Sequence, residues 1–332
     1  MARIALVHDI AGVAAVQAEI LRRAGHQVDQ IALPEWGAGW RWPLKAFALP
    51  VRVAGYVPDI GRLRSGRYDV VHIHWLAQGI VGILAGREFF AQAHGSDLHL
   101  NMNNPVYGRI TRAVLRRAKS VFYVTPNLRH YLRGFESKLH YLPNPIDVDA
   151  IAPAASTPSR VSRVLIFSRI DPVKGVDRIF PAAERLSELA EVTAPDWGPL
   201  KDEYVARYGK WVNFAPLVPH AEVAAFVQRF DVVVGQMRQG ILSLSEIEAM
   251  AARRPVITGI DRSLYEEDQP PVIDVGGPDD IVAAVARLRD DPRELARLGE
   301  EGRAWVRRNH SYERHLRVLE GAYFGTGTST AM

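Results

Sequence analysis

Two cations lie in one short turn of the sequence. Arg169 and Lys174 belong to the stretch Arg169–Gly175, which follows an apolar run, Val164–Phe167, typical of a buried strand. A strand-to-helix turn offers free backbone N–H groups, and two cations there are suited to holding a diphosphate. Arg169 can grip two oxygens, whereas Lys174 supplies a point charge. The alternative interpretation is a pair of solvated surface cations on a loop.

A carboxylate follows a second turn of the same kind. Gly240 precedes a helical stretch, Ser243–Ala251, whose first residues would offer free backbone N–H groups. Glu248 lies about one turn into that helix, where its carboxylate can accept both hydroxyls of a ribose. The alternative is an ordinary capped helix with acidic residues in its first turns.

The N-terminal half contributes a histidine and a glycine. His94 begins the turn His94–Asp97, directly after the predicted strand Phe89–Ala93. Gly12 stands in the first strand-to-helix turn, where a small residue lets backbone approach a ligand. An isolated histidine is more often a packed core residue, and we interpret His72 and His74 in that way.

Strands and helices must alternate to position these turns, and apolar runs and helical spacing alternate in both halves. Such alternation indicates parallel sheets covered on both faces. The predicted strands are Ile4–Val7, Val28–Leu33, Val70–His74, Phe89–Ala93, Val121–Thr125, Val164–Phe167, Trp211–Phe214, Val232–Val234, Val256–Thr258 and Val272–Val275.

A proline-rich and small-residue stretch separates the two halves. We predict an N-terminal domain over 1–147, a linker over 148–162 and a C-terminal domain over 163–310. A last helix over 311–324 and a frayed tail over 325–332 would follow. Two doubly wound Rossmann-like domains would face each other across a cleft, with ligands just outside the strand ends.

Composition limits the classes of protein to consider. The chain has 332 residues, a net charge of +4 and no cysteine, which excludes disulfides and thiolate chemistry. The sequence shows neither a signal peptide nor a run of about 20 apolar residues. We therefore expect a cytoplasmic protein, with the inner face of the membrane as an alternative location. The positive charge suits anionic ligands such as nucleotides, phospholipid headgroups or nucleic acid.

In their order and spacing, these motifs resemble the retaining GT-B glycosyltransferases, the nucleotide-sugar-dependent group 1 family that includes mannosyltransferases. The resemblance runs along nearly the whole chain. It rests on the Gly12 turn, Gly25–Val28, Tyr68–His74, His94–Asp97, Leu142–Asp147, Arg169 with Lys174 and Gly175, Glu248–Ala251 and Pro255–Ile257.

The resemblance implies a retaining hexosyltransferase that uses a nucleotide sugar such as a UDP- or GDP-sugar, without a metal or other cofactor. The C-terminal helix would return to the N-terminal domain. Arg169 and Lys174 would neutralise the diphosphate, and Glu248 would hold the ribose. The backbone around Ser243 and Leu244 would cap the phosphates.

For the N-terminal domain, the resemblance implies that Gly12 approaches the diphosphate and that His94 contacts the transferred sugar as the catalytic residue. The chain departs from the family at Gly240, where a second glutamate usually contacts the sugar hydroxyls. Gln239 or Arg238 would then compensate, or the sugar is held differently. The usual glycine-rich strand end is also missing at Val192–Asp196.

The acceptor is less determined by the sequence: a sugar, a lipid-linked molecule or a small molecule all fit. Trp40, Arg41 and Trp42 lie in an aromatic loop that could stack on a sugar, rest at a membrane interface or cover the domain's own core. The basic amphipathic stretch Arg109–Lys119 could contact an anionic membrane, or form a solvated helix face.

Two other functions remain open at this stage. One is a catalytically weak or inactive nucleotide-sugar-binding protein, because of Gly240. The other is a glycosyltransferase acting on modified bases in DNA, although no nucleic-acid recognition motif is present. A nicotinamide dehydrogenase is set aside, because the first turn, His8–Val16, has Gly12 alone where such enzymes carry three glycines.

Overall fold

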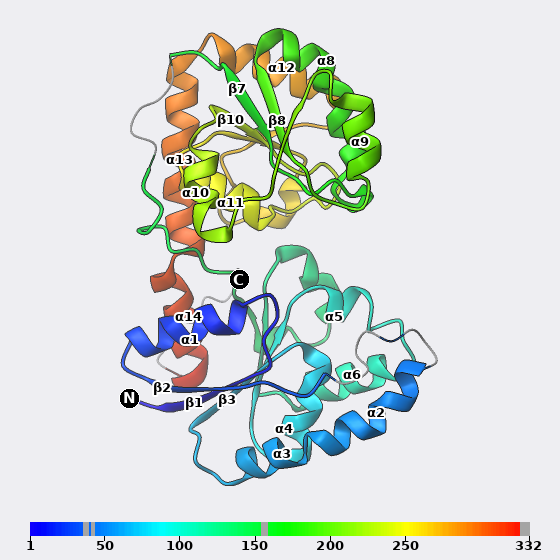
Figure 1. Ribbon diagram of the computed structural model, residues 1–332. Coiled ribbons are helices and arrows are strands. Elements are labelled where there is room, and N and C mark those ends of the chain that lie inside the picture. Colours follow the sequence, from blue (N-terminus) through cyan, green and yellow to red (C-terminus); the bar gives the residue numbers. More distant parts are fainter. Residues whose placement is uncertain (36–39, 41–43, 154–158, 326–332) are drawn as a thin grey trace. The chain divides into compact units, whose positions relative to one another are not determined.

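The chain folds into two compact units. The computed structural model describes residues 1–35, 40, 44–153 and 159–325. Unit 1 comprises Met1–Pro145 and Glu313–Met332, and unit 2 comprises Ile146–Tyr312. In the described residues, each unit contains one parallel sheet of six strands with helices on both faces (Figure 1). The predicted α/β fold with two doubly wound domains is confirmed.

The sheet of unit 1 has the strand order β2-β1-β3-β4-β5-β6, and all neighbours are parallel. These strands are β1 (Arg3–Val7), β2 (Gln27–Ile31), β3 (Val70–His74), β4 (Phe90–Ala93), β5 (Ser120–Tyr123) and β6 (Leu139–Tyr141). The strand order reverses between β1 and β3. Doubly wound sheets bind ligands at such a switch point, beyond the carboxyl ends of the strands.

Alternate residues of these strands enter different cores, as the period of two requires. Ile4 and Leu6 face one side of β1 and Ala5 and Val7 the other. The covering helices are α1 (Val13–Arg23), α2 (Leu44–Gly55), α3 (Val57–Arg64), α4 (Ile80–Ala85), α5 (Ser96–His99), α6 (Tyr107–Arg117) and the C-terminal α14 (Tyr312–Phe324).

Helix α14 packs in unit 1, as predicted. Its Leu319 and Tyr323 are buried in the same cluster as Ile4 and Leu6, so it lies beside α1 on one face of the sheet (Figure 1). The hydroxyl of Tyr323 lies 2.5 Å from Nδ1 of His72 on β3. The last segment of the chain therefore completes the core of the first domain.

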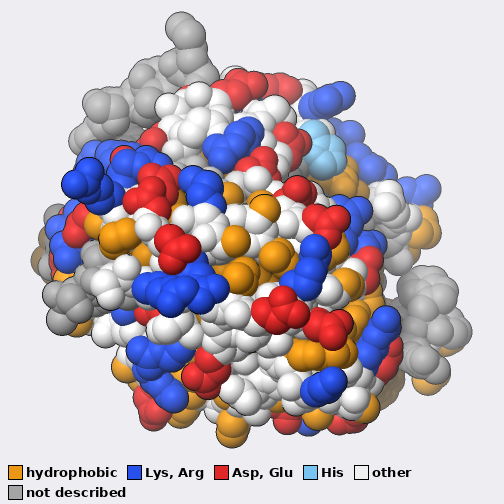
Figure 2. Space-filling model, turned by 90° about the horizontal axis from the view of Figure 1, so that it is seen from above, with side chains coloured by type: hydrophobic (Ala, Val, Ile, Leu, Met, Phe, Trp, Pro, Cys, Tyr) orange, Lys and Arg blue, Asp and Glu red, His pale blue; other side chains and the backbone are white. Residues whose placement is uncertain are grey.

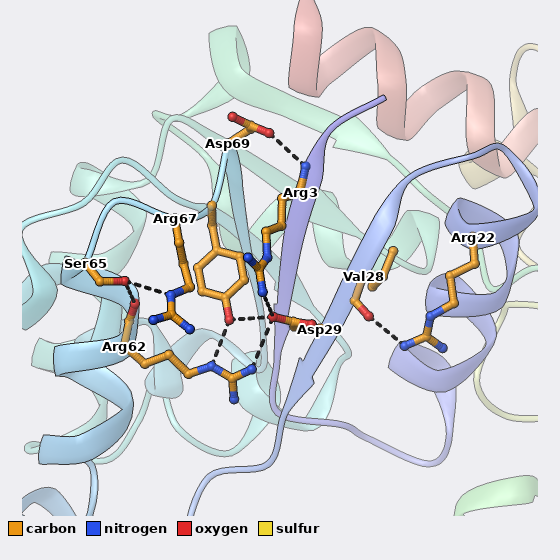
Figure 3. A network of polar contacts seen from close by, with 9 residues as sticks. Arg3, Arg22, Val28, Asp29, Arg62, Ser65, Arg67 and Asp69 are labelled. Atoms are coloured by element: carbon orange, nitrogen blue, oxygen red, sulfur yellow. Dashed lines mark hydrogen bonds and ion pairs between the residues drawn. The ribbon is translucent and has the colours of Figure 1, made fainter.

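A polar network fastens the edge strand β2 to its surroundings (Figure 3). One carboxylate oxygen of Asp29 accepts hydrogen bonds from Arg3 at 3.2 Å, Arg62 at 3.2 Å and the Tyr68 hydroxyl at 2.8 Å. Hydrogen bonding to Tyr68 and to the two guanidinium groups lowers the pKa of Asp29. Because Arg62 belongs to α3, the network ties this helix to the sheet edge.

The sheet of unit 2 has the order β12-β11-β10-β7-β8-β9, again wholly parallel. Its strands are β7 (Arg163–Ile166), β8 (Glu191–Pro195), β9 (Asn213–Ala215), β10 (Val232–Val234), β11 (Val256–Thr258) and β12 (Ile273–Asp274). This is the order of a dinucleotide-type fold, and its switch point lies between β7 and β10.

The helices of unit 2 bury both faces of that sheet in two apolar clusters. They are α7 (Val176–Ile179), α8 (Ala183–Leu189), α9 (Lys201–Tyr208), α10 (Val223–Val227), α11 (Leu244–Ala251), α12 (Pro278–Arg289) and α13 (Pro292–His310). Arg303 of α13 donates to the carbonyls of Val148 and Ile151. The first part of the predicted linker is thereby fastened to unit 2.

Some local predictions differ from the structure. Most strand boundaries shift by one or two residues. Two strands were not predicted: β6, whose three half-buried residues give little pattern, and β8, whose Thr and Pro interrupt the apolar run. The turn after β7 leads through a 3-10 turn, Pro172–Lys174, into α7, so the helix that follows the cation turn has only four residues. Residues 154–158 of the predicted linker and 326–332 of the predicted tail lie outside the described residues. No helix in the described ranges has both the length and the apolar character needed to cross a bilayer.

Candidate active site

The cation turn after β7 is held by its own carboxylate. Asp171 accepts the backbone N–H of Val173 at 3.0 Å through one oxygen and pairs with Arg169 at 2.5 Å through the other. Arg169 is partly exposed, yet its Nε is buried without a hydrogen-bond partner among the described residues. A buried donor without a partner is costly. An anion bound at this turn would satisfy it.

Lys174 links this turn to the one that follows β10. Its Nζ donates to Oε1 of Gln239 at 2.7 Å, and its carbonyl accepts the N–H of Met237 at 2.8 Å. Burial lowers the pKa of Lys174, the nearby Glu246 carboxylate raises it, and Arg169 lowers it. Gly175 has a φ of 73°, and a Cβ there would lie 3.1 Å from the Met237 backbone. Glycine thus allows the two turns to meet at the switch point of unit 2.

The buried amide of Gln236 shapes the turn after β10. Its oxygen accepts the N–H groups of Arg238 at 2.9 Å and Gln239 at 2.7 Å. Its nitrogen donates to the carbonyls of Ile241 at 2.6 Å and Gly259 at 3.2 Å. One side chain therefore satisfies four backbone groups, and the position of Gln239 beside Lys174 follows from it.

A second buried group, Glu246, completes this scaffold. Its carboxylate accepts the N–H of Gln236 at 2.9 Å, the N–H of Ser243 at 2.5 Å and the hydroxyl of Thr258. Burial raises its pKa, and these hydrogen bonds lower it. A Cβ at Gly235 would collide with this carboxylate. Because Ser243 already donates its N–H to Glu246, the predicted phosphate contact from that N–H is corrected.

The start of α11 still offers a free donor at Leu244. This residue is 41% exposed, and no described residue accepts its N–H. Glu248, one turn further, is nearly buried, and its carboxylate lies 3.0 Å from Nε2 of the exposed His220. Burial raises the pKa of Glu248, while His220 lowers it. The imidazole ring of His220 thus helps to fix the position of the nearly buried Glu248 carboxylate.

The turn after β8 brings an aromatic ring to the cation turn. Trp197 is 47% exposed, and the Arg169 guanidinium lies 5.7 Å from its ring centroid. The carbonyl of Trp197 accepts the N–H of Ile170 at 2.8 Å. Gly198 has a φ of 135°, and a Cβ there would lie 2.3 Å from the Ile170 carbonyl oxygen. The strand end Val192–Asp196 lacks a glycine, but Gly198 follows two residues later, where the backbone of this turn packs against the backbone of Ile170.

In unit 1, the turn after β1 has an unusual backbone. His8, Ala11 and Gly12 all have positive φ values of 66°, 52° and 80°. Such conformations are costly for residues other than glycine and cluster at functional sites. Asp9 accepts the N–H of Ala14 at 2.9 Å and caps α1. Gly12 is exposed, and open space lies where its Cβ would be.

The turn after β4 is organised by Asp97. This fully buried carboxylate accepts the N–H groups of His94 at 3.1 Å, Gly95 at 2.9 Å and Leu76 at 3.1 Å. Burial raises the pKa of Asp97 to about 6, and these hydrogen bonds oppose the rise. Leu76 follows Trp75, whose φ of 67° is rare for a bulky residue. The turns after β3 and β4 are thus joined through one side chain.

His94 lies at the carboxyl edge of the sheet and is partly exposed, whereas His72 and His74 are fully buried. Nε2 of His94 lies 3.1 Å from Nδ1 of His74. Burial and, to a smaller extent, the nearby His8 together lower the pKa of His94 to about 4. All three rings are neutral near pH 7, and the interpretation of His72 and His74 as core residues agrees with their burial.

The predicted acceptor-side residues are only partly described. Trp40 is 44% exposed, whereas Arg41 and Trp42 lie outside the described residues. The basic stretch forms α6, with Arg109, Arg112, Arg116 and Arg117 exposed. On α2, the exposed residues Leu44, Phe47 and Val51 lie at helical spacing. Unit 1 thus displays one apolar and one basic helix face.

No group of three or more His, Asp or Glu residues in the described ranges is arranged to hold a metal ion. Asp147–Asp149, an Asp-x-Asp pattern, was assigned no metal from the sequence, and Asp149 pairs with Arg307 at 2.5 Å. The cations predicted from the sequence for this candidate site are Arg169 and Lys174, which the structure places on the turn after β7.

Sequence reasoning missed the residues that build the site rather than contact a ligand. Gln236 stands in no recognised motif, and Glu246 belongs to the Ser243–Glu246 capping-box pattern, which marks a helix start rather than a binding site. The exposed His220 follows the predicted strand Trp211–Phe214, so a search of the residues beyond that strand would have found it. Trp197 follows β8, which was not among the predicted strands, so such a search would have missed it.

Two six-stranded parallel sheets, each covered by helices on both faces, are the architecture of the GT-B class of two-domain α/β proteins. Comparison with known families agrees. Residues 13–150 match the model described as Glycosyltransferase Family 4, and residues 178–321 match that described as Glycosyl transferase-like. The chain belongs to the GT-B glycosyltransferases.

Two curated relatives are mannosyltransferases. The chain is 29% identical over 181 residues to MMP alpha-(1->4)-mannosyltransferase of Mycolicibacterium hassiacum, a match covering 50% of this chain and 43% of that protein. It is 26% identical over 301 residues to GDP-mannose-dependent alpha-(1-6)-phosphatidylinositol monomannoside mannosyltransferase of Mycolicibacterium smegmatis, covering 77% of each. The first match thus spans less than half of that relative's length.

Solved structures share the fold. The sucrose-phosphate synthase of Thermosynechococcus elongatus superposes with a TM-score of 0.74 at 18% identity, covering 97% of this chain and 98% of that one. Anabaena HepE in complex with UDP-glucose gives a TM-score of 0.69 at 13% identity, covering 96% and 99%. At these identities the likeness concerns the fold.

Proposed function

We propose that the chain transfers a hexosyl group from a nucleoside diphosphate sugar to a sugar or lipid-linked acceptor, with unit 2 holding the donor. The observation that carries this proposal is the pair of turns at the switch point of unit 2. There Arg169, with an unsatisfied buried Nε, and the partly desolvated Lys174 lie next to each other. Two cations of this kind are suited to a diphosphate.

The donor contacts follow from this position. Arg169 would exchange its bond to Asp171 for phosphate oxygens, and Lys174 would move from Gln239 to the leaving phosphate. The N–H of Leu244 adds a donor at the start of α11. Glu248, oriented by His220, would accept the ribose hydroxyls. Positive charge at the leaving oxygen stabilises the charge that develops as the glycosidic bond breaks.

Gln239 is the best candidate to replace the glutamate that the family carries at position 240. Arg238 is exposed and makes a two-point ion pair with Asp177, at 2.9 and 2.7 Å, whereas Gln239 lies against Lys174. Gly240 itself has a φ of 68°, and a Cβ there would lie 3.3 Å from Cβ of Asp261. An amide would then contact the sugar where relatives use a carboxylate.

Unit 1 would supply the catalytic contact through His94, with Gly12 offering exposed backbone to an anion. Transfer with retention of anomeric configuration is part of the same proposal and is supported by the family resemblance. A proton NMR spectrum of the first product would test it, because the anomeric coupling distinguishes retention from inversion. A metal is not required in this scheme, since cations of the chain face the leaving group.

A lipid-linked acceptor has specific support in unit 1. The exposed apolar residues of α2 and the arginines of α6 fit an anionic membrane surface. The relative from Mycolicibacterium smegmatis is named for a phosphatidylinositol monomannoside substrate. Vesicles with and without anionic lipid would distinguish a membrane-bound acceptor from a soluble one in a flotation assay.

The two alternatives have less support. An inactive binding protein would need Arg169 and Lys174 as much as an enzyme does, but it would not need His94 at the edge of the sheet in unit 1 as a catalytic contact. For DNA, the face drawn in Figure 2 shows Lys and Arg interspersed with Asp and Glu rather than one basic field. On α12 and α13, for instance, Arg287 and Arg297 both pair with Glu294. Basic fields are the usual footprint of nucleic-acid binding.

The decisive experiment combines binding and turnover. A panel of UDP- and GDP-sugars is screened by thermal shift, and the best donor is incubated with the protein alone and with mannosides or phosphatidylinositol mannosides. We expect slow donor hydrolysis alone and faster release of nucleoside diphosphate with an acceptor. Donor binding without any turnover would support the inactive protein instead.

A further inference from the structure

Three histidine rings form a column in unit 1. His72 and His74 lie on the same face of β3, and their rings stack at 4.8 Å with an angle of 12°. The ring of His94 follows at 5.2 Å from His74, with an angle of 28°. The column therefore runs from the fully buried core to the carboxyl edge of the sheet.

The two rings of the column nearest the edge of the sheet, those of His74 and His94, share one hydrogen bond. Nδ1 of His74 and Nε2 of His94 are 3.1 Å apart, so one nitrogen must donate and the other must accept. Burial keeps both rings neutral, since it lowers the pKa of His74 far below its usual value and that of His94 to about 4. A neutral imidazole carries a single N–H. The tautomer of each ring thus decides that of the other.

The surroundings of His74 select between the two arrangements. Its Nε2 is buried and has no hydrogen-bond partner in the described part of the chain. If the proton of His74 were on Nε2, a buried N–H would be left without an acceptor. If the proton is on Nδ1, only a lone pair is left unsatisfied. Orphaned buried N–H groups are the rarer of the two in folded proteins.

We propose that His74 donates its Nδ1–H to Nε2 of His94 and thereby fixes His94 as the tautomer with its proton on Nδ1. No described residue bonds that Nδ1, and Asp97 holds the backbone from which the ring projects. His94 then presents an N–H donor at the edge of the sheet. In this tautomer the exposed nitrogen donates to a hydroxyl or phosphate oxygen and cannot accept a proton.

The other groups facing the column agree with this arrangement. His72 is bonded through Nδ1 to the Tyr323 hydroxyl, and no described contact is a hydrogen bond between His72 and either of the other two rings. His8 is a nearby titratable ring that lowers the pKa values of His74 and His94, and no described contact is a hydrogen bond from His8 to either ring. His74 is therefore a positioning residue. Its catalytic consequence rests on the proposed role of His94, whereas the tautomer itself does not.

The tautomer can be read directly in the wild-type protein. Long-range ¹H–¹⁵N spectra of histidine-labelled protein at neutral pH separate protonated from bare ring nitrogens, and the His94→Gln spectrum identifies the His94 signals. We expect protonated Nδ1 and bare Nε2 in both His74 and His94. A proton on Nε2 of His94 would overturn the proposal. This readout does not depend on any activity or on a variant's catalytic competence.

Two substitutions of the same size then test the consequence. His74→Asn keeps an N–H donor near the position of Nδ1, whereas His74→Asp offers an acceptor. We expect His74→Asn to keep most of the parent kcat, and His74→Asp to lower kcat about 100–1,000-fold, as loss of one oriented donor does, with donor KM little changed. Equal kcat values for the two would refute the positioning role. If His94→Ala also turned over normally, the role of His94 would fail while the tautomer stood.

If the buried aspartate prevents folding, His74→Leu, which offers neither donor nor acceptor, replaces it. The ring of His94 should then show both neutral tautomers in the nitrogen spectrum. A single Nδ1–H tautomer that persists in His74→Leu would mean that His74 does not select it, and this would overturn the proposal.

Discussion

The two units place their functional residues at the same edge of similar sheets but equip them differently. The edge of unit 2 carries cations and carboxylates, and buried polar side chains such as Gln236 and Glu246 hold the turns. The edge of unit 1 carries neutral histidines and a backbone with several positive φ values. A diphosphate would be bound by charged side chains, which remain partly solvated. An oriented neutral hydrogen-bond donor, by contrast, can be built from buried histidine rings. The predicted cation Arg169 of unit 2 is therefore partly exposed, whereas burial lowers the pKa values of the histidines in unit 1.

The largest effect should come from removing the charges of unit 2. Arg169→Ala with Lys174→Ala should weaken nucleoside diphosphate binding by several kcal/mol, at about 1.5–3 kcal/mol for each charged hydrogen bond lost. Isothermal titration calorimetry measures it. Arg185→Ala, which removes an exposed cation paired with Asp279, is the matched control and should bind normally. Unchanged affinity in the double variant would remove the basis of the donor site.

The next largest effect should be a loss of stability in acid that is greater for unit 1 than for unit 2. The pKa values of His72, at about 3, and of His94, at about 4, lie below the ordinary 6.5, and that of His74 is lowered too. Between about pH 4 and 6.5 the unfolded chain binds more protons, so stability is full above that range and falls as the pH decreases. The slope is up to about 1.4 kcal/mol per pH unit for each histidine.

Hydrogen exchange at pH 7 and pH 5.5 would resolve this acid response by unit. We expect β3 and β4 of unit 1 to lose protection before β7 and β10 of unit 2. His72→Phe removes one titrating ring and should flatten the response of unit 1. Equal loss of protection in both units would contradict the assignment of neutral histidines.

Two glutamates on α11 offer a test within a single helix. Glu246→Gln places an amide against two backbone N–H donors and should cost about 1–3 kcal/mol of stability. Glu248→Gln should leave the melting temperature near that of the parent and lower nucleotide affinity. Paired denaturation and calorimetry measure both. If Glu248→Gln lost stability with intact affinity, the carboxylate would be structural, and the His220 contact would belong to the fold.

The smallest effect concerns the missing family carboxylate. Gly240→Glu should not restore a sugar contact and should cost about 1–2 kcal/mol of stability, because φ there is 68°. Gln239→Ala, by contrast, should lower kcat without loss of stability. Urea denaturation with initial-rate kinetics separates the two. A Gly240→Glu variant more active than the parent would show that the sugar contact belongs at position 240.

The sequence alone determined the class of fold and most residues at the strand ends. Continuous apolar runs, separated by stretches with helical spacing, are local signals, so the strands at Val70–His74, Val232–Val234 and Val256–Thr258 were predicted with the observed bounds. Arg169, Lys174, Glu248 and His94 were named because they follow such runs. Whether they bind as predicted is left to the experiments above.

Only the tertiary structure decided which groups those residues meet. The N–H of Ser243, at the helix start predicted to cap phosphates, is taken by Glu246 three residues later in a local capping box. What the tertiary structure adds is the contact of the same carboxylate with Gln236 and Thr258. Gln239 beside Lys174, His220 beside Glu248 and His74 beside His94 are contacts over 20–65 residues of sequence. No local pattern records such pairs. They arise where parallel strands end side by side, which depends on strand order and therefore on the whole sheet.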